Sequence, residues 1–194
     1  MAIEFKETLQ VDAPIDRVWE FVNDPRRVVT CMPGAVLDEV VDERTFLGTV
    51  KVKVGAITAS YKGRVVFTEV DAQAHTMQIV AEGRETGGGT ARGKISIRLS
   101  SPAEGPTEFV TEASVDLTGR LMQVGRGMIQ GVSHQLFKQF AASAKELLEA
   151  PVEAGAVEAV VAEQEPIRVL PLLFRTLWEA VVRFFRRLFG RSSD

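Results

Sequence analysis

The sequence predicts an α+β domain in which a curved antiparallel sheet wraps around a long C-terminal helix and leaves an apolar cavity, followed by a separate amphipathic tail helix. Three observations predict this arrangement. Apolar and polar residues alternate over residues 35–117, and apolar residues then recur at helical spacing over residues 120–149. Residues 167–194 combine large apolar side chains with arginines.

The N-terminal segment predicts one strand and two short helices. Residues 3–11 alternate apolar and polar side chains, as a half-buried strand does. Asp12 is expected to cap a helix that carries Pro14 in its first turn and ends near Asn23. Asp24 and Pro25 end this helix, and a second short helical turn is expected before Cys31.

A two-residue period over residues 35–117 predicts the sheet. Residues 50–54 alternate valines with lysines, and residues 94–99 and 108–117 show the same alternation. Each strand therefore has one apolar and one charged face, which favours a single antiparallel sheet over an apolar interior. The turn signals at 41–43, 71–73 and 102–106 are short enough for a meander.

One long helix is predicted over residues 120–149. Its apolar stripe is formed by Leu121, Met128, Val132, Leu136, Phe140 and Leu147. Gly125, Gly127 and Gly131 are interpreted as thinning the helix where another part of the fold or a ligand comes close. A strand, short helices, a meander and a long helix in this order make a helix-grip arrangement, in which the sheet curls around the helix.

The expected cavity would be lined by the loop after the second helix, by the sheet and by the long helix. The predicted ligand-binding residues are Cys31, Met32, Pro33, Tyr61, Phe67, Met77, Met128, Val132, Leu136 and Phe140. Cys31 to Gly34 form a candidate lid, because Pro33 places a stiff bend beside the permissive Gly34. The alternative is an ordinary packed core in which this loop is a structural turn.

Composition argues against several classes of function. One cysteine and two histidines exclude an internal disulfide and make a metal site within one chain improbable, so no metal ligands and no covalent cofactor are predicted. No catalytic residues are predicted, because no nucleophile–base–acid set is visible, although spacing alone does not exclude a triad assembled in space. No basic face with interleaved aromatics supports nucleic-acid binding. The N-terminus lacks a secretory signal pattern, so a cytoplasmic protein is expected.

Charge divides the chain into a domain over residues 1–149, an acidic linker over 150–166 and a basic tail over 167–194. Residues 166–194 carry six arginines and two acids, a net charge of +4, whereas the rest carries 17 basic and 24 acidic residues, a net charge of −7. The predicted membrane-binding residues are Leu173, Phe174, Arg175, Leu177, Trp178, Val181, Arg183, Phe184, Phe185, Arg186, Arg187, Leu188 and Phe189.

The tail is better suited to the membrane surface than to spanning. Residues 171–189 would form a helix about 28 Å long, but four arginines and Glu179 lie within it. Each arginine at the centre of a bilayer costs roughly 2.5–3.5 kcal/mol. The sequence therefore predicts a peripheral protein on the inner face of the cell membrane. The alternatives are that the tail docks on a partner protein or on its own domain.

Five segments resemble the family of the carbon monoxide dehydrogenase G-subunit, within the START-like (SRPBCC) ligand-binding superfamily. They are residues 29–35 (VTCMPGA), 50–55 (VKVKVG), 61–63 (YKG), 87–91 (GGGTA) and 117–121 (LTGRL). Met32 stands where leucine is more usual, and the resemblance covers about residues 1–149. It implies a helix-grip fold with a deep apolar cavity, and a role in recruiting or maturing a molybdenum-type CO dehydrogenase at the cytoplasmic membrane. No ligands for molybdenum or CO are evident.

The resemblance and the tail together lead to a functional hypothesis. A soluble dehydrogenase that oxidises a gas must pass electrons to quinone in the membrane, and an apolar cavity could shield the isoprenoid chain of a quinone, menaquinone included. The expected ligand is therefore a quinone or another apolar lipid, carried between an anionic membrane and the enzyme. Recruitment without ligand transport and a small START-like enzyme, such as a cyclase, are the alternatives.

Overall fold

The computed structural model describes residues 2–102 and 105–150 of the chain. In chain order they form β1 (Ala2–Val11), α1 (Ile15–Asn23), α2 (Pro25–Cys31), β2 (Ala35–Asp42), β3 (Thr45–Val54), β4 (Ile57–Asp71), β5 (Thr76–Glu85), β6 (Thr90–Ser100), β7 (Thr107–Leu117), the 3₁₀ helix η1 (Arg120–Val124) and α3 (Arg126–Glu149). The predicted linker and tail helix lie outside these residues.

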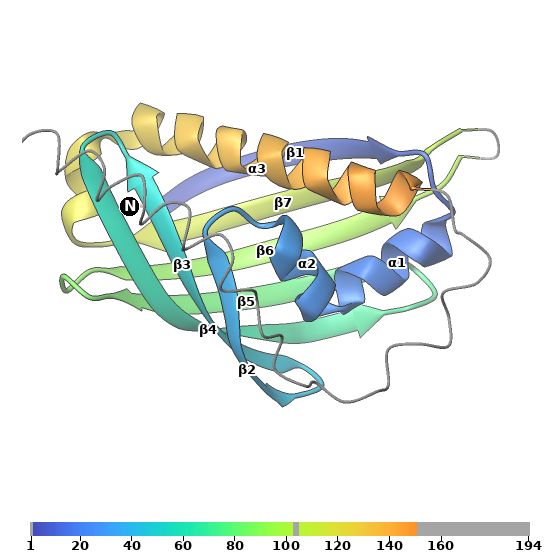
Figure 1. The fold of residues 1–194 in the computed structure, drawn as a ribbon, viewed down its shortest axis with the longest axis horizontal. Coiled ribbons are helices and arrows are strands. Elements are labelled where there is room, and N and C mark those ends of the chain that lie inside the picture. The colour runs from blue at the N-terminus through green and yellow to red at the C-terminus, as the bar shows by residue number, and fades with distance from the viewer. Residues whose placement is uncertain (1, 103–104, 151–194) are drawn as a thin grey trace, which may run out of the picture. The chain divides into compact units, whose positions relative to one another are not determined.

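The strands make one seven-stranded antiparallel sheet in the order β1-β7-β6-β5-β4-β3-β2. Strands β2 to β7 follow one another as a meander, and β1 joins the far edge beside β7. The sheet curves, and α3 lies along its concave side while α1 and α2 lie near one end (Figure 1). The α+β helix-grip arrangement predicted for the domain is confirmed.

The start of α1 differs from the prediction. Asp12 does not cap the helix, because α1 begins at Ile15 and its N-cap position belongs to Pro14, with no side-chain capping bond. The Pro14 carbonyl accepts from the amides of Arg17 and Val18. The Asp12 backbone amide donates to the Glu149 side chain at the end of α3 over 2.8 Å.

The predicted long helix is interrupted at Gly125. Residues 120–124 form η1, and α3 begins only at Arg126. Gly119 and Gly125 flank η1, each with φ of +83°, a conformation that favours glycine. An added Cβ at Gly125, Gly127 or Gly131 would meet no other described residue within 4 Å, so close approach of another part of the described fold does not explain these glycines, and approach of a ligand stays a prediction.

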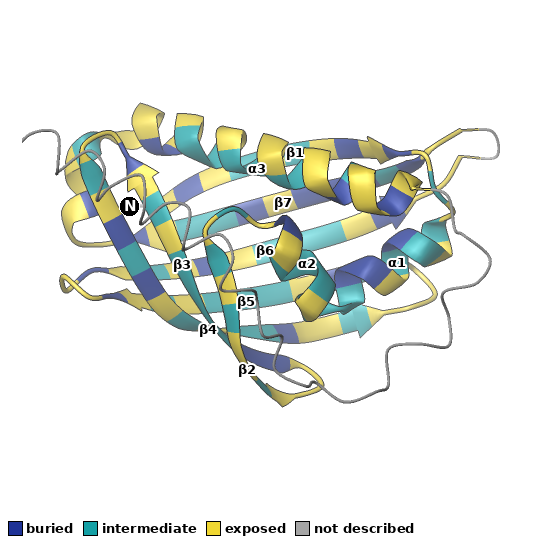
Figure 2. Ribbon diagram, in the orientation of Figure 1, coloured by how far each residue is buried: buried dark blue, intermediate teal, exposed yellow. Residues whose placement is uncertain are grey.

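The inward side of α3 matches the predicted stripe in the middle of the helix and differs from it at both ends. The inward residues include Ile129, Val132, Leu136, Phe140, Ala144 and Leu148, all buried or half-buried. Met128 and Leu147, placed in the stripe by the prediction, are 48% and 39% exposed, and their neighbours Ile129 and Leu148 are buried instead. Leu121 is buried as predicted but belongs to η1. Exposed residues follow the outer side of α3 (Figure 2).

The buried apolar residues fall into four clusters around the concave face. One cluster joins α1 and the end of α3 to the sheet and contains Val18, Phe21 and Leu148. The other three centre on Tyr61 with Leu121, on Ile3 with Ile129, and on Phe46 with Phe67 and Met77. Separate clusters mean that the concave side is not filled by one continuous core. In the part of the chain described, no helix is long and apolar enough to cross a bilayer.

A row of small residues crosses the concave face at one level. Gly48 of β3 pairs with Gly63 of β4, which pairs with Gly83 of β5, which pairs with Ala91 of β6. An added Cβ at Gly63 would lie 2.2 Å from the carbonyl oxygen of Glu82, whereas one at Gly83 would meet its nearest atom, Cβ of Tyr61, at 3.4 Å. Gly63 is therefore required by backbone packing, and Gly83 is not.

We expect Gly63→Ala to destabilise the domain by roughly 1–3 kcal/mol, because backbone atoms of β5 must move. The matched control, Gly83→Ala, should change the free energy of unfolding by less than about 1 kcal/mol, with stabilisation as the expected sign. Urea denaturation of both variants measures the difference. Equal effects at the two glycines would contradict the steric assignment.

Candidate functional site: an apolar cavity

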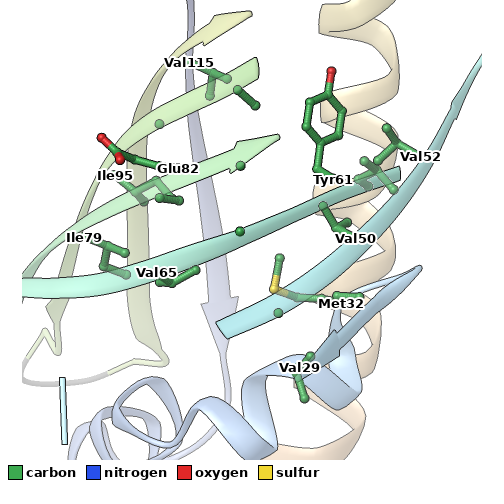
Figure 3. Close-up of a pocket in the computed structure, with 18 of the residues that line it drawn as sticks. Val29, Met32, Val50, Val52, Tyr61, Val65, Ile79, Glu82, Ile95 and Val115 are labelled. Atoms are coloured by element: carbon green, nitrogen blue, oxygen red, sulfur yellow. The ribbon is translucent and has the colours of Figure 1, made fainter. Parts of the chain in front are cut away.

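A cavity of about 490 Å³ lies between the concave face of the sheet and the helices that cover it. Side chains from α2, from the sheet and from α3 form its wall. Figure 3 shows Val50, Val65, Ile79 and Ile95 of successive strands around this space, with Met32 at its edge. Pockets of roughly 300–1,000 Å³ are typical of small-molecule sites.

The wall residues have an unusual combination of orientation and exposure. Val50, Val52, Val65, Ile79, Ile95, Val115, Val132 and Leu136 line the cavity, yet all are only half-buried. On the strands these positions alternate with more exposed residues such as Lys51 and Lys94, so they belong to the inner face. Half-burial of inward residues means that they border space rather than other side chains.

Six of the ten predicted ligand-binding residues lie in the wall: Met32, Tyr61, Phe67, Val132, Leu136 and Phe140. The structure brings them together from α2 and its following loop, from β4 and from α3. Their role in ligand binding stays a proposal, because their position shows only that they border the cavity.

The other four predicted residues do not line the cavity. Cys31 and Met77 are buried in packed clusters, Cys31 with α1 and Met77 with two phenylalanines. Met128 is exposed and lies against Gly55 in the turn between β3 and β4. Pro33 belongs to the loop after α2 but is absent from the wall. At the start of α3, Ile129 lines the cavity in place of the neighbouring Met128. For Cys31 and Met77, an apolar residue type does not distinguish packed core from cavity.

Sequence reasoning missed much of the wall. The omitted residues include Val29, Val50, Val52, Val65, Ile79, Ile95, Val115, Leu121 and Ile129. For the strand residues, the signal was available as the inward phase of each two-residue alternation. A second signal was glycine at inward strand positions. Gly48, Gly63, Gly83 and Gly93 all border the cavity, and the absence of a side chain at each leaves space next to the sheet.

The cavity opens beside the loop between α2 and β2. Met32 lines the cavity and is also 45% exposed, so this side chain lies at the opening. The loop is fixed to β3, because the Lys51 amide donates to the Gly34 carbonyl over 2.9 Å. Gly34 has φ of +75°, and an added Cβ would lie 2.4 Å from the Lys51 carbonyl oxygen. This close approach requires glycine.

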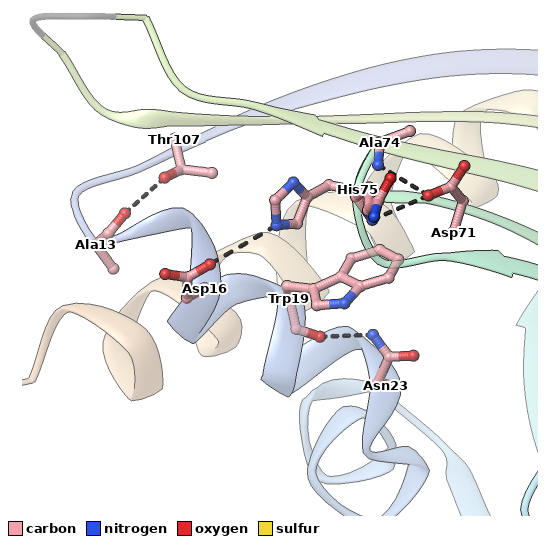
Figure 4. A network of polar contacts seen from close by, with 9 residues as sticks. Ala13, Asp16, Trp19, Asn23, Asp71, Ala74, His75 and Thr107 are labelled. Carbon is pink, nitrogen blue, oxygen red and sulfur yellow. Dashed lines mark hydrogen bonds and ion pairs between the residues drawn. The ribbon is translucent and has the colours of Figure 1, made fainter.

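Helix α1 is held on the sheet by polar and aromatic contacts (Figure 4). His75, in the turn between β4 and β5, lies 3.7 Å from an Asp16 carboxylate oxygen and contacts Trp19 edge-on with 5.4 Å between ring centroids. The Thr107 hydroxyl donates to the Ala13 carbonyl over 2.6 Å. These contacts secure the helix that contributes Val22 to the cavity wall.

A polar cluster lies beside the wall where η1 begins. Tyr61 and Glu85 are paired across β4 and β5, and Arg120 forms an ion pair with the buried Glu85 carboxylate. Burial, and secondarily the charge of Glu85, raise the pKa of Tyr61, while Arg120 opposes this shift. The hydrogen bond to Glu85 raises the pKa of Arg120. The Tyr61 hydroxyl and Glu85 Oε2 are buried and have no hydrogen-bond partner among the described residues.

Other ionisable groups at the wall point elsewhere. Glu82 pairs with Arg92 over 2.9 Å, and both side chains are more than half exposed. Across residues 2–102 and 105–150, no three His, Cys, Asp or Glu side chains gather as a metal site. The chemistry that this wall offers is therefore burial of apolar surface, with Tyr61 as a polar group next to it.

Solved structures with low sequence identity share the fold. A conserved protein from Geobacillus kaustophilus has a TM-score of 0.66 at 17% identity, with 77% of this chain and 95% of that chain covered. The Zhui aromatase/cyclase from Streptomyces sp. R1128 has a TM-score of 0.59 at 15% identity, covering 80% and 99%. A START superfamily protein from Mycobacterium smegmatis has a TM-score of 0.51 at 10% identity, covering 75% and 97%. The fold is therefore START-like.

A comparison with curated proteins gives no match. The sequence model of the carbon monoxide dehydrogenase G-subunit (CoxG) matches residues 8–148, from the last residues of β1 to the last turn of α3. The resemblance noted at residues 29–35 and in the four later segments falls inside this match. Because the match covers most of its length, the chain belongs to the CoxG family, that of the carbon monoxide dehydrogenase G-subunit.

Proposed function

We propose that the domain binds a quinone in its cavity and carries it between the cytoplasmic membrane and a CO dehydrogenase-type enzyme. The observation that carries this proposal is the cavity of about 490 Å³ with a wall of mostly apolar side chains. Family membership supports a role in a CO dehydrogenase system. The domain acts as a binding protein, not as a catalyst.

The chemistry of quinones suits this cavity. An isoprenoid chain partitions into lipid because its apolar surface is costly to expose to water, and each 100 Å² that leaves water contributes about 2.5 kcal/mol. The valines and isoleucines of β3, β4, β5 and β6 offer such a surface on one side, and Val132 and Leu136 of α3 offer it on the other. A quinone also carries two carbonyl oxygens, for which a nearby hydroxyl is a suitable donor.

Tyr61 is the proposed polar contact for the ligand. Tyr61 lines the cavity, and its hydroxyl is buried without a partner among the described residues. A buried hydroxyl without a hydrogen bond costs free energy. A ligand carbonyl would remove that cost once the side chain turns its hydroxyl toward the cavity, which favours a ligand with an oxygen at one end and an apolar chain.

The tail completes the proposal. Residues 150–166 are proposed as an acidic linker and residues 167–194 as a helix that lies on the membrane surface, with Phe184 and Phe185 among the upper acyl chains. This arrangement would keep the domain near both the quinone pool and an enzyme at the membrane. Recruitment of the enzyme without ligand transport is the competing proposal and rests on the same family membership.

A small START-like enzyme is the second candidate. The structural similarity to an aromatase/cyclase and to norcoclaurine synthase from Thalictrum flavum favours it, since both share the fold. At 15% identity each, these similarities establish architecture alone. Conversion of an added polyketide by the purified protein would support this candidate, and binding without conversion supports the carrier.

We expect native mass spectrometry of gently purified protein to detect a bound quinone. Val132→Trp should abolish that binding, because the indole occupies the cavity, while the melting temperature changes little. In a filled core the same change would overpack and cost roughly 1–3 kcal/mol. The control is Gln130→Trp on the exposed side of α3, which should retain the quinone. Marked destabilisation by Val132→Trp with quinone uptake intact would favour recruitment alone.

The ionisation of Tyr61 provides a second test, because it is the only tyrosine of the chain. The pKa of Tyr61 is raised in the folded state. The stability contributed by its neutral hydroxyl is therefore fully present below the unfolded-state pKa of about 10, and it is lost as the pH rises through the folded-state pKa. Ultraviolet absorbance of tyrosinate should show titration above pH 10, and quinone binding should move it higher. Titration at the ordinary pKa would contradict burial of this hydroxyl.

Tyr61→Phe should change the free energy of unfolding at neutral pH by less than about 1 kcal/mol and weaken quinone binding.

Removal of residues 167–194 should leave a folded domain that loses at least about tenfold in affinity for anionic vesicles.

In the full chain, Phe184→Asp with Phe185→Asp should weaken flotation with vesicles more than Arg186→Ala with Arg187→Ala does. Two buried rings outweigh two screened charges at physiological salt. The reverse order would show that attachment is mainly electrostatic.

A further inference from the structure

Four cations lie on the outer face of the sheet. Lys51 and Lys53 in β3, Lys62 in β4 and Arg84 in β5 are all exposed and alternate with residues of the inner face. In the described part of the chain none of them takes part in an ion pair. Lys62 and Arg84 are direct cross-strand partners, and like charges in this position destabilise a sheet. The fold itself therefore gives no reason for this cluster.

Two exposed apolar side chains lie next to these cations. Val36 in β2 pairs with Thr49, and Thr49 pairs with Lys62, so the row continues across the outer face to Arg84. Val36 is 58% exposed, and Met32 at the cavity opening is 45% exposed. Met32, Val36, Lys51, Lys53, Lys62 and Arg84 together are termed the mouth patch.

One end of the mouth patch lies beside the opening of the cavity. The hydrogen bond from the Lys51 amide to the Gly34 carbonyl joins β3 to the loop that carries Met32, and Lys62 and Arg84 extend the patch along the outer face of the sheet. The acids on this face are Asp38, which accepts a hydrogen bond from the Thr49 hydroxyl over 2.8 Å, and Glu39 and Glu82 one row further along. With Arg64 and Arg92 in that row, six cations against three acids leave an excess of positive charge on a domain whose overall charge is negative.

We propose that the mouth patch is a docking surface for an anionic lipid bilayer. Lipid phosphates would contact the lysines and Arg84, and Met32 and Val36 would enter the boundary of the acyl chains. Exposed apolar side chains beside these cations favour a bilayer over an acidic protein surface, which offers no apolar layer behind its charges. This inference rests on the proposed function in one respect: a ligand exchanged with the bilayer has to pass this opening.

The docking surface and the tail have separate roles. A single weak anchor gives marginal membrane binding, and stable attachment takes two signals. The tail would keep the chain at the membrane, and the mouth patch would hold the outer face of β3 to β5 against lipid, with the opening at Met32 at the margin of this contact. Orientation can therefore be tested in the full chain, independently of attachment.

The test places an environment-sensitive fluorophore, NBD, at Val36→Cys in a Cys31→Ala background of the full chain. With vesicles of phosphatidylcholine and phosphatidylglycerol, we expect a blue shift and increased emission. The matched control is Val41→Cys, which is similarly exposed at 51% but lies between acids at 39, 42 and 43. This site should stay in water. Changing Lys51, Lys53, Lys62 and Arg84 to Gln should weaken the response at position 36 by roughly tenfold or more.

Each other outcome overturns the proposal. Unchanged NBD emission at position 36 would overturn it, whether or not the chain floats with the vesicles. Equal changes in emission at positions 36 and 41 would overturn it as well. No response on vesicles, with loss of binding to a CO dehydrogenase-type enzyme in the Gln variant, would assign the patch to an acidic protein. The measurement needs no quinone, so failure of the carrier proposal and failure of the docking surface are distinguishable.

Discussion

The concave face of the sheet presents more apolar surface than the helices can cover, and the rest of the structure depends on this imbalance. A single long helix, α3, lies along the seven strands of the described domain, and its inward side chains reach the sheet in separate clusters. Native interiors are densely packed, and an unfilled space loses dispersion contacts. In this domain the inward residues around the space stay half-buried.

The ends of the sheet hold polar contacts. At one end His75 and Thr107 tie α1 to the sheet, and at the other Arg120 pairs with the buried Glu85. The remaining wall is apolar because a buried polar group without a partner costs free energy. The Tyr61 hydroxyl is buried beside this wall without a partner among the described residues, and for this reason it is central to the proposed ligand contact.

Family, cavity and surface charge lead to one account of how the protein could work. The family is that of the carbon monoxide dehydrogenase G-subunit, and the described domain contains an apolar cavity with Met32 at its opening. Under the carrier proposal, the mouth patch would present this cavity to lipid, because a carrier needs an opening near the source of its ligand. The fold alone does not separate a carrier from a cyclase, since an aromatase/cyclase shares it.

The sequence by itself determined the fold class, the order of elements and the family. Strand alternation and helical spacing are local patterns, and both follow directly from backbone geometry. Tertiary structure decided which residues at the two ends of α3 face the sheet, where Ile129 and Leu148 are buried and Met128 and Leu147 are not. It also decided which apolar residues border space. Cys31 and Met77 are packed whereas Val65 and Ile79 are not, because that difference depends on neighbours from distant elements, and side-chain type does not encode it.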